Sequence, residues 1–150
     1  MKKFKFRLEN VLELRTKTLE DRQLEMAAIQ VRLNDANNKL DSLEQSRLQA
    51  KRDLENILGA GENIEFIRVK NYQDYIAKLD DDISIQHKVI ADIENELELK
   101  QEEVREALKA KKMLEKLKEK EYKAFLKDFE QREAKELDDI ALTRYRGPGV

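Results

Sequence analysis

The feature that most constrains this chain is a heptad repeat that runs from Leu8 to Ile57 almost without interruption. Alternating steps of four and three residues meet fifteen positions, of which twelve are apolar and three are Arg15, Arg22 and Arg47. A 3.5-residue repeat of this length specifies a long helix with a narrow apolar seam, supercoiled left-handed around a partner helix. A helix of a globular core shows a wider stripe and rarely exceeds about 25 residues.

The partner helix is predicted to lie in the same chain. A second repeat extends from Tyr72 to Leu114, and ten of its thirteen positions are apolar. Between the repeats, Gly59 or Gly61 can adopt the left-handed conformation that ends a helix, and Asn63 is a suitable N-cap for the next helix. A turn this short closes at little entropic cost, which favours a hairpin over an antiparallel dimer.

The expected fold is therefore all-α: one antiparallel two-helix coiled-coil hairpin over residues 1–150, with a longer C-terminal helix. We expect helix one over about 8–58, the turn over 59–63 and helix two over about 64–145.

Folding back near residue 61 pairs residues whose numbers sum to 122, to within a few residues. This register places Arg47 near Tyr75, and we hypothesise that the guanidinium stacks on the ring. It also leaves residues beyond about 120 without a partner helix. Tyr122, Phe125 and Phe129 lie on that part, where three rings indicate a docking surface, because a lone helix does not need them.

Charge follows blocks along helix two. Residues 80–103 are predominantly acidic, Lys109 to Lys123 are basic, and residues 128–139 are acidic again. Most of these charges are interpreted as solvated faces with incidental pairs between residues three or four apart.

Composition excludes several classes of function. The 30 basic and 32 acidic side chains leave a net charge of -2, which gives no global attraction to phosphate or anionic lipid. There is no cysteine and no recognisable phosphate-binding loop, and the single His87 has no metal co-ligand or nucleophile at a recognisable spacing. A two-helix rod offers no concave pocket that would desolvate a carboxylate, so we predict no enzymatic activity, no metal and no cofactor.

The start of the chain indicates a cytoplasmic protein. Residues 1–7 are basic, but Glu9 and Glu13 interrupt the stretch where a signal peptide requires an apolar core. No run approaches the 18 or so apolar residues that span a bilayer.

Three stretches carry a resemblance that covers the chain in order. They are the opening Phe4-Lys5-Phe6-Arg7-Leu8-Glu9-Asn10-Val11-Leu12-Glu13-Leu14-Arg15; then Asn71-Tyr72-Gln73-Asp74-Tyr75-Ile76-Ala77-Lys78-Leu79; and finally Leu114-Glu115-Lys116-Leu117-Lys118-Glu119-Lys120 with Glu133-Ala134-Lys135-Glu136-Leu137-Asp138-Asp139-Ile140-Ala141. They are similar to F-x-F-x-L-x-x-x-L-x-x-R, NYxxYIxxL, LEKLxEK and E-x-KELDxIA. Together they resemble the FliJ family of flagellar export proteins.

The resemblance implies a stalk in the flagellar type III export apparatus, similar to the part of the gamma subunit of rotary ATPases that enters the catalytic ring. Family members bind the hexameric export ATPase FliI through the end that carries both termini, and promote its assembly. They also contact the cytoplasmic domain of the export-gate membrane protein FlhA, and some bind export chaperones. The implied location is cytoplasmic, peripheral to the inner face of the cell membrane at the flagellar basal body, with no nucleic acid bound.

The candidate site residues fall into two groups. The resemblance and the aromatic stripe together mark an ATPase-binding set: Phe4, Phe6, Arg7, Arg15, Phe125, Phe129, Glu133, Lys135, Glu136 and Asp138. The resemblance marks a gate-binding set on helix two: Tyr72, Tyr75, Leu79 and Gln86. Leu79 also occupies a seam position, so packing is its alternative role.

Three alternatives remain at this stage. The equivalent stalk of a virulence-type injectisome would use the same mechanism in a different machine. A nucleic-acid-binding coiled-coil arm requires a continuous basic stripe, which only Lys109 to Lys123 resembles. An inert spacer would leave the terminal motifs without a purpose.

Overall fold

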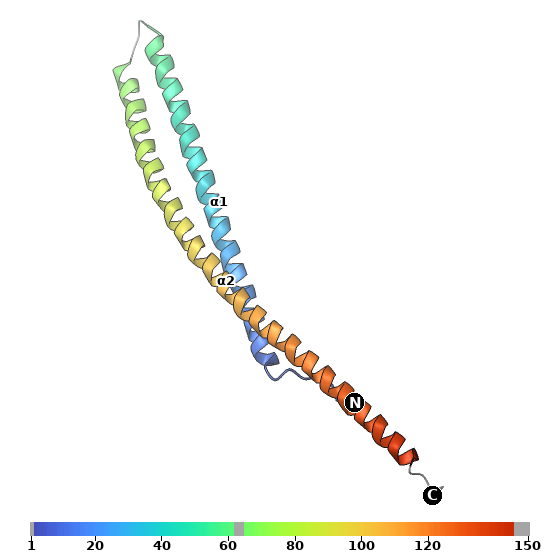
Figure 1. The fold of residues 1–150 in the computed structure, drawn as a ribbon. Helices are drawn as coiled ribbons and strands as arrows, with labels where there is room; N and C mark the ends of the chain where they lie inside the picture. The colour runs from blue at the N-terminus through green and yellow to red at the C-terminus, as the bar shows by residue number, and fades with distance from the viewer. Residues whose placement is uncertain (1, 62–64, 146–150) are drawn as a thin grey trace. The chain divides into compact units, whose positions relative to one another are not determined.

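The chain folds into two long α-helices. The computed structural model describes residues 2–61 and 65–145, and within these ranges it contains no strand. Helix α1 spans Glu9–Gly59 and helix α2 spans Phe66–Tyr145, with 51 and 80 residues (Figure 1). The all-α fold with two packed helices, the second longer, is confirmed. The helix ends lie within two residues of the expected bounds.

The turn between the helices uses one of the two predicted glycines in a left-handed conformation. Gly59 is the last residue of α1, and Gly61 has a φ of 82°. A side chain at Gly61 would strain the backbone there, since L residues with a Cβ rarely adopt this conformation. The expected N-cap Asn63 lies outside the described residues.

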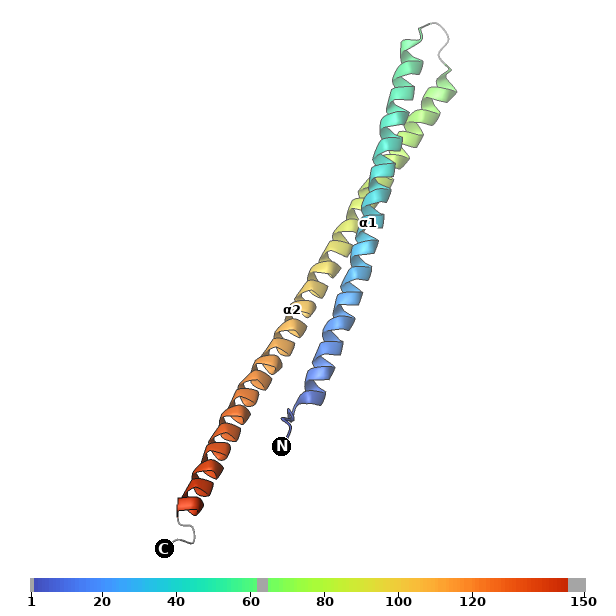
Figure 2. The ribbon, with the colours of Figure 1, turned by 90° about the vertical axis from the view of Figure 1, so that its right-hand side faces the viewer.

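Contacts divide the chain into two units, which we describe separately. The central unit is Arg22–Val104, and the terminal unit is Met1–Asp21 together with Arg105–Val150. In each unit a part of α1 lies antiparallel to a part of α2, as both views show (Figures 1 and 2). The central unit has 11 basic and 18 acidic residues, a net charge of -7, whereas the terminal unit has 19 basic and 14 acidic residues, a net charge of +5.

The core of the central unit is formed by residues of the two predicted seams. Its buried members are Ile29, Ala36, Ile90 and Ile93, and the half-buried Leu33, Leu40 and Leu97 pack against them. Burial of each Leu or Ile side chain stabilises the pair by about 1.5–3 kcal/mol. The 3.5-residue pattern therefore identified the packing face of both helices.

Polar residues that interrupt the seams have partners in the central unit. The buried Gln86 donates a hydrogen bond from Nε2 to the Ala36 carbonyl oxygen across the helix pair, at 2.9 Å. Because a buried polar group is costly without its partner, this bond favours one register of the two helices over its neighbours.

A charged cluster forms at a second interruption of the seams. The Lys100 ammonium lies 2.7 Å from Glu25 Oε2 and 2.7 Å from Glu103 Oε2, and Arg22 Nη1 lies 3.2 Å from Glu25 Oε2. Hydrogen bonds from Lys100 and then Arg22 hold the pKa of Glu25 below its ordinary value. The hydrogen bonds that Lys100 donates, first to Glu103 and second to Glu25 in order of effect, raise the pKa of Lys100.

The observed register agrees with the expected one to within a few residues. In the central unit, the buried bond joins Gln86 to Ala36, whose numbers sum to 122, whereas the ion pairs Glu25–Lys100 and Arg32–Glu96 have sums of 125 and 128. The guanidinium of Arg47, which we hypothesised to stack on Tyr75, pairs with Asp80 instead.

In the terminal unit the N-terminal residues continue the packing beyond the start of α1. Phe6, Leu12 and Leu19 are buried. Arg7 Nε lies 3.2 Å from Glu121 Oε1, and Lys118 Nζ lies 2.9 Å from Glu9 Oε2. These pairs place residues 2–8, which precede the helix, along α2.

The last part of α2 has no buried side chain. Every residue from 130 to 145 is exposed, including Leu137 and Ile140. We call residues 130–145 the C-terminal overhang. We expected residues beyond about 120 to lack a partner helix. Side chains of α2 are uniformly exposed only from residue 130, because Phe4 and Arg7 of the N-terminal segment contact residues 121–125.

Candidate functional site

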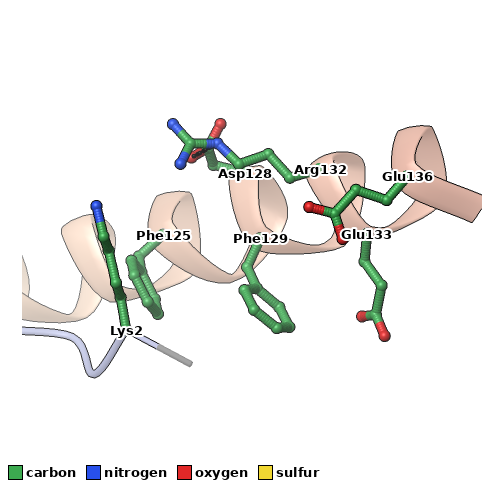
Figure 3. A pocket seen from close by; sticks show the side chains of 7 residues that line it. All are labelled: Lys2, Phe125, Asp128, Phe129, Arg132, Glu133 and Glu136. Atoms are coloured by element: carbon green, nitrogen blue, oxygen red, sulfur yellow. Dashed lines mark ion pairs between the residues drawn. The ribbon is translucent and has the colours of Figure 1, made fainter. Parts of the chain in front are cut away.

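The terminal unit carries a shallow amphipathic groove, which we call the phenylalanine groove. Its lining consists of Lys2, Phe125, Asp128, Phe129, Arg132, Glu133 and Glu136. Phe125 and Phe129 lie four residues apart on one face of α2, and the Lys2 side chain stands beside Phe125 (Figure 3). Both rings are half-buried, so they are held in place while part of each surface remains open to a partner.

Phe4 supports the groove from the N-terminal segment. Its ring centroid lies 5.6 Å from that of Phe125 and 5.3 Å from that of Tyr122, with tilted planes. Tilted ring pairs at this separation are favourable beyond the apolar area they bury. Tyr122 is 45% exposed and lies outside the groove lining, so the groove face contains Phe125 and Phe129 but not the third ring of the predicted stripe.

Charged side chains border the two rings. Arg132 Nε pairs with Asp128 Oδ2 at 3.2 Å, while Glu133 and Glu136 lie at the far end of the groove, within the overhang (Figure 3). The arrangement provides an apolar contact surface with a partly neutralised rim and two carboxylates. Such a surface suits binding of a protein side chain rather than chemistry, since it is open to solvent and does not desolvate its acids.

The predicted ATPase-binding residues occupy three kinds of position. Phe125, Phe129, Glu133 and Glu136 come together in the groove, and Phe4 lies against it. Phe6 is 7% exposed, so its role in the structure is packing. Arg7 is paired with Glu121, and the remaining members are exposed outside the groove: Arg15, Lys135 and Asp138.

The predicted gate-binding residues lie in the central unit, on different faces of α2. Leu79 and Gln86 are buried, at 4% and 5% exposure, so both face α1. Tyr72 is half-buried and Tyr75 is 46% exposed. Only the two tyrosines offer surface to a partner in this conformation.

Sequence reasoning did not identify three residues of the groove: Lys2, Asp128 and Arg132. The spacing of Asp128 and Arg132 could have predicted their place in the groove. Each lies three residues after one of the two phenylalanines, and residues three apart are neighbours on a helix surface. Lys2 had no such signal, since its position depends on how the N-terminal segment lies along α2.

Among the described residues there is neither a membrane-spanning helix nor a cluster of metal ligands. No helix there has the length and apolar character needed to cross a membrane. In the same ranges, His, Cys, Asp and Glu side chains do not gather in threes as metal ligands.

Comparison with known proteins decides the family. The family described as "Flagellar FliJ protein" matches residues 4–149. The chain belongs to the FliJ family. A curated relative, the flagellar FliJ protein of Bacillus subtilis (strain 168), is 26% identical over 147 residues, which cover 95% of each chain. No solved structure matches this chain.

FliJ membership confirms the resemblance that the three sequence stretches carried. Membership of this family makes the chain a component of flagellar protein export. The antiparallel helix pairs of the two units fit the coiled-coil hairpin that the heptad repeats predict.

Proposed function

We propose that this protein is a stalk of the flagellar type III export apparatus that binds the export ATPase hexamer FliI and promotes its assembly. It links the hexamer to the cytoplasmic domain of the gate protein FlhA and to export chaperones. Its place is cytoplasmic, peripheral to the inner face of the cell membrane through these partners.

The observation that carries the ATPase contact is the phenylalanine groove next to the C-terminal overhang. Half-exposed aromatic rings with a charged rim are the residue types that dominate binding energy at protein interfaces. Both rings are half-buried on the helix, and Phe125 also contacts the Phe4 ring, so little side-chain entropy is lost when a partner covers them. Glu133 and Glu136 add charge selectivity at the same place.

The gate contact is assigned to the exposed side of the tyrosine pair. Tyr75 has 46% of its surface open, and Tyr72 lies one turn before it. Leu79 and Gln86 are buried and act by packing the helix pair, in which the bond from Gln86 to the Ala36 carbonyl oxygen favours one register.

The first experiment measures ATP hydrolysis and hexamer formation by the cognate export ATPase with and without this protein. We expect both to rise when the protein is added. Unchanged activity together with an unchanged oligomeric state would overturn the stalk function.

The second experiment tests the groove with Phe125→Ala combined with Phe129→Ala. Loss of two aromatic anchors is expected to weaken ATPase binding by about tenfold or more, since hot-spot truncations cost about 2 kcal/mol or more. The matched control is Leu24→Ala with Val31→Ala, which removes two side chains that are 70% and 59% exposed on α1 of the central unit. The control variant is expected to bind normally.

A third variant separates binding from packing. Glu133→Gln with Glu136→Gln changes the rim of the groove while leaving its rings in place. Weaker ATPase binding with unchanged helicity supports the groove as the contact. Normal binding by both groove variants would assign the contact to another surface.

A further inference from the structure

A basic stripe runs along the solvent-facing side of α2 in the terminal unit. Steps of three and four residues connect its members: Arg105, Lys109, Lys112, Lys116, Lys120, Lys123 and Lys127. At about 100° per residue these seven cations fall within a sector of about 80° on the helix, and they extend over roughly 33 Å at 1.5 Å per residue. All seven are exposed.

The stripe lies on the face of α2 opposite to its packing face. Leu114 and Leu117, which are half-buried, point toward the N-terminal part of the unit, and Lys112 and Lys116 are about half a turn away from Leu114. The basic stripe is thus separate from the phenylalanine groove, none of whose lining residues it shares.

Most of the positive charge on the stripe is not neutralised. Glu115 pairs with Lys111, which is outside the stripe, and Glu119 pairs with Lys123. Five lysines have no ion-pair partner anywhere in residues 2–61 and 65–145: Lys109, Lys112, Lys116, Lys120 and Lys127. The whole terminal unit carries a net charge of +5, so the stripe adds to a favourable field for anions.

The form of the stripe selects among anionic partners. Nucleic-acid duplexes present phosphates that wind around an axis, and single strands require aromatic stacking platforms. The stripe is straight and contains no aromatic residue. A protein partner would use a central apolar or aromatic anchor, whereas Leu108 and Met113 lie at the margins of the stripe.

An anionic bilayer surface fits these features better. It is a plane of negative charge without fixed geometry, so it suits a straight line of flexible ammonium groups, which are hydrated point charges lacking the fork of arginine. Six of the seven stripe residues are lysine. The exposed Leu108 and Met113, which share a shallow depression with four stripe residues, would contact the headgroup region beside them.

We propose that the basic stripe adsorbs the terminal unit onto an anionic lipid surface, with the lysines over the headgroups. The contact is electrostatic and peripheral, and it does not depend on the ATPase or the gate. It is therefore a membrane contact of the chain itself, in addition to any contact made through partners.

The test is co-sedimentation of the full chain with vesicles. One vesicle preparation contains one third phosphatidylglycerol in phosphatidylcholine, and the other is phosphatidylcholine alone. We expect binding to the first at low salt, no binding to the second, and release at high salt, where the Debye length is short. Replacing Lys109, Lys112, Lys116 and Lys120 by Gln should reduce partitioning by about fivefold per lysine.

A matched variant controls for total charge. Replacing Lys39, Lys51, Lys70 and Lys78 by Gln changes the net charge by the same amount with exposed lysines of the central unit. It should bind the anionic vesicles almost as well as the unchanged chain. Circular dichroism should give equal helicity for both variants, because Gln is a good helix former.

Three results would overturn the proposal. The first is absence of binding to the anionic vesicles at low salt. The second is equal loss of binding in the stripe variant and the matched variant, which would mean that total charge decides. The third is stripe-dependent binding of duplex DNA, or of a polyglutamate peptide, that is tighter than vesicle binding.

Discussion

The central and terminal units use the same two helices but differ in what their side chains do. In the central unit, apolar seam residues from both helices bury each other, and the polar residues at the interruptions pair across or beside the seam. In the terminal unit the helix pairing ends, the non-helical residues 2–8 take the place of α1, and two phenylalanines and seven aligned cations remain exposed or half-exposed. A complete seam provides stability, and an incomplete one leaves side chains for partners.

The largest expected effect comes from the core of the central unit. Ile93→Ala should reduce the free energy of unfolding by about 2–4 kcal/mol, because it removes a buried side chain and leaves a cavity. Leu99→Ala is the control on the same helix, since Leu99 is 71% exposed, and should change stability by less than about 0.5 kcal/mol. Urea unfolding followed by circular dichroism measures both. Equal effects would mean that this seam does not hold the unit together.

A smaller and local effect is expected in the terminal unit. Phe4→Ala removes the ring that contacts Tyr122 and Phe125, which should release residues 2–8 from α2 at a cost of about 1–2 kcal/mol. Hydrogen exchange and limited proteolysis of the N-terminal segment should report the change, while exchange in the central unit stays the same. Lys5→Ala, at an exposed position in the same segment, is the control. Destabilisation of both units together would contradict the division of the chain into a central and a terminal unit.

The smallest effect concerns the charged cluster of the central unit. Because the folded-state pKa of Glu25 is lowered, its contribution to stability is present above the ordinary glutamate value of about 4.3 and is lost as pH falls through the folded pKa. Glu25→Gln should therefore flatten the acid side of the stability profile. Because the folded-state pKa of Lys100 is raised, its contribution to stability is present below the ordinary lysine value of about 10.4. That contribution is lost at high pH, as pH rises through the folded pKa, so it does not affect the acid side of the profile.

Urea titrations at a series of pH values from neutral to about 3 measure this dependence. Glu44→Gln is the control, because Glu44 is exposed in the same unit and has no ion pair in the described part of the chain. A profile for Glu25→Gln that matches that of Glu44→Gln would show that the cluster does not couple folding to protonation.

The helices and their packing face were predictable because a 3.5-residue period depends on side-chain identity alone. The register was predictable only to within a few residues. The expected sum of roughly 122 holds for the buried bond between Gln86 and Ala36, whereas the ion pairs of Asp80, Glu96 and Lys100 have sums of 125 to 128. A shift of one turn keeps seam residues facing each other, so the apolar pattern alone does not define the register. The polar pairs between the helices add that information.

The candidate site was predictable in part for a similar reason. Phe125 and Phe129 could be placed on the unpaired end of helix two because their spacing is helical. Lys2, and the burial of Phe6, depend on the course of residues 2–8, which have no periodicity to read. In the gate-binding set, the family resemblance marked Leu79 and Gln86 as contact residues, but the structure buries both side chains. The resemblance alone did not show which of its positions are exposed.

The C-terminal overhang has a consequence for how a partner would associate with it. A separate helix of this length would be marginal in water, since forming its first turn is unfavourable. The overhang continues α2 from turns that are already packed, so only propagation is required. A partner that binds residues 130–145 therefore meets a helix that is already formed. It does not have to supply the free energy of coupled folding, and its association rate need not be limited by helix nucleation.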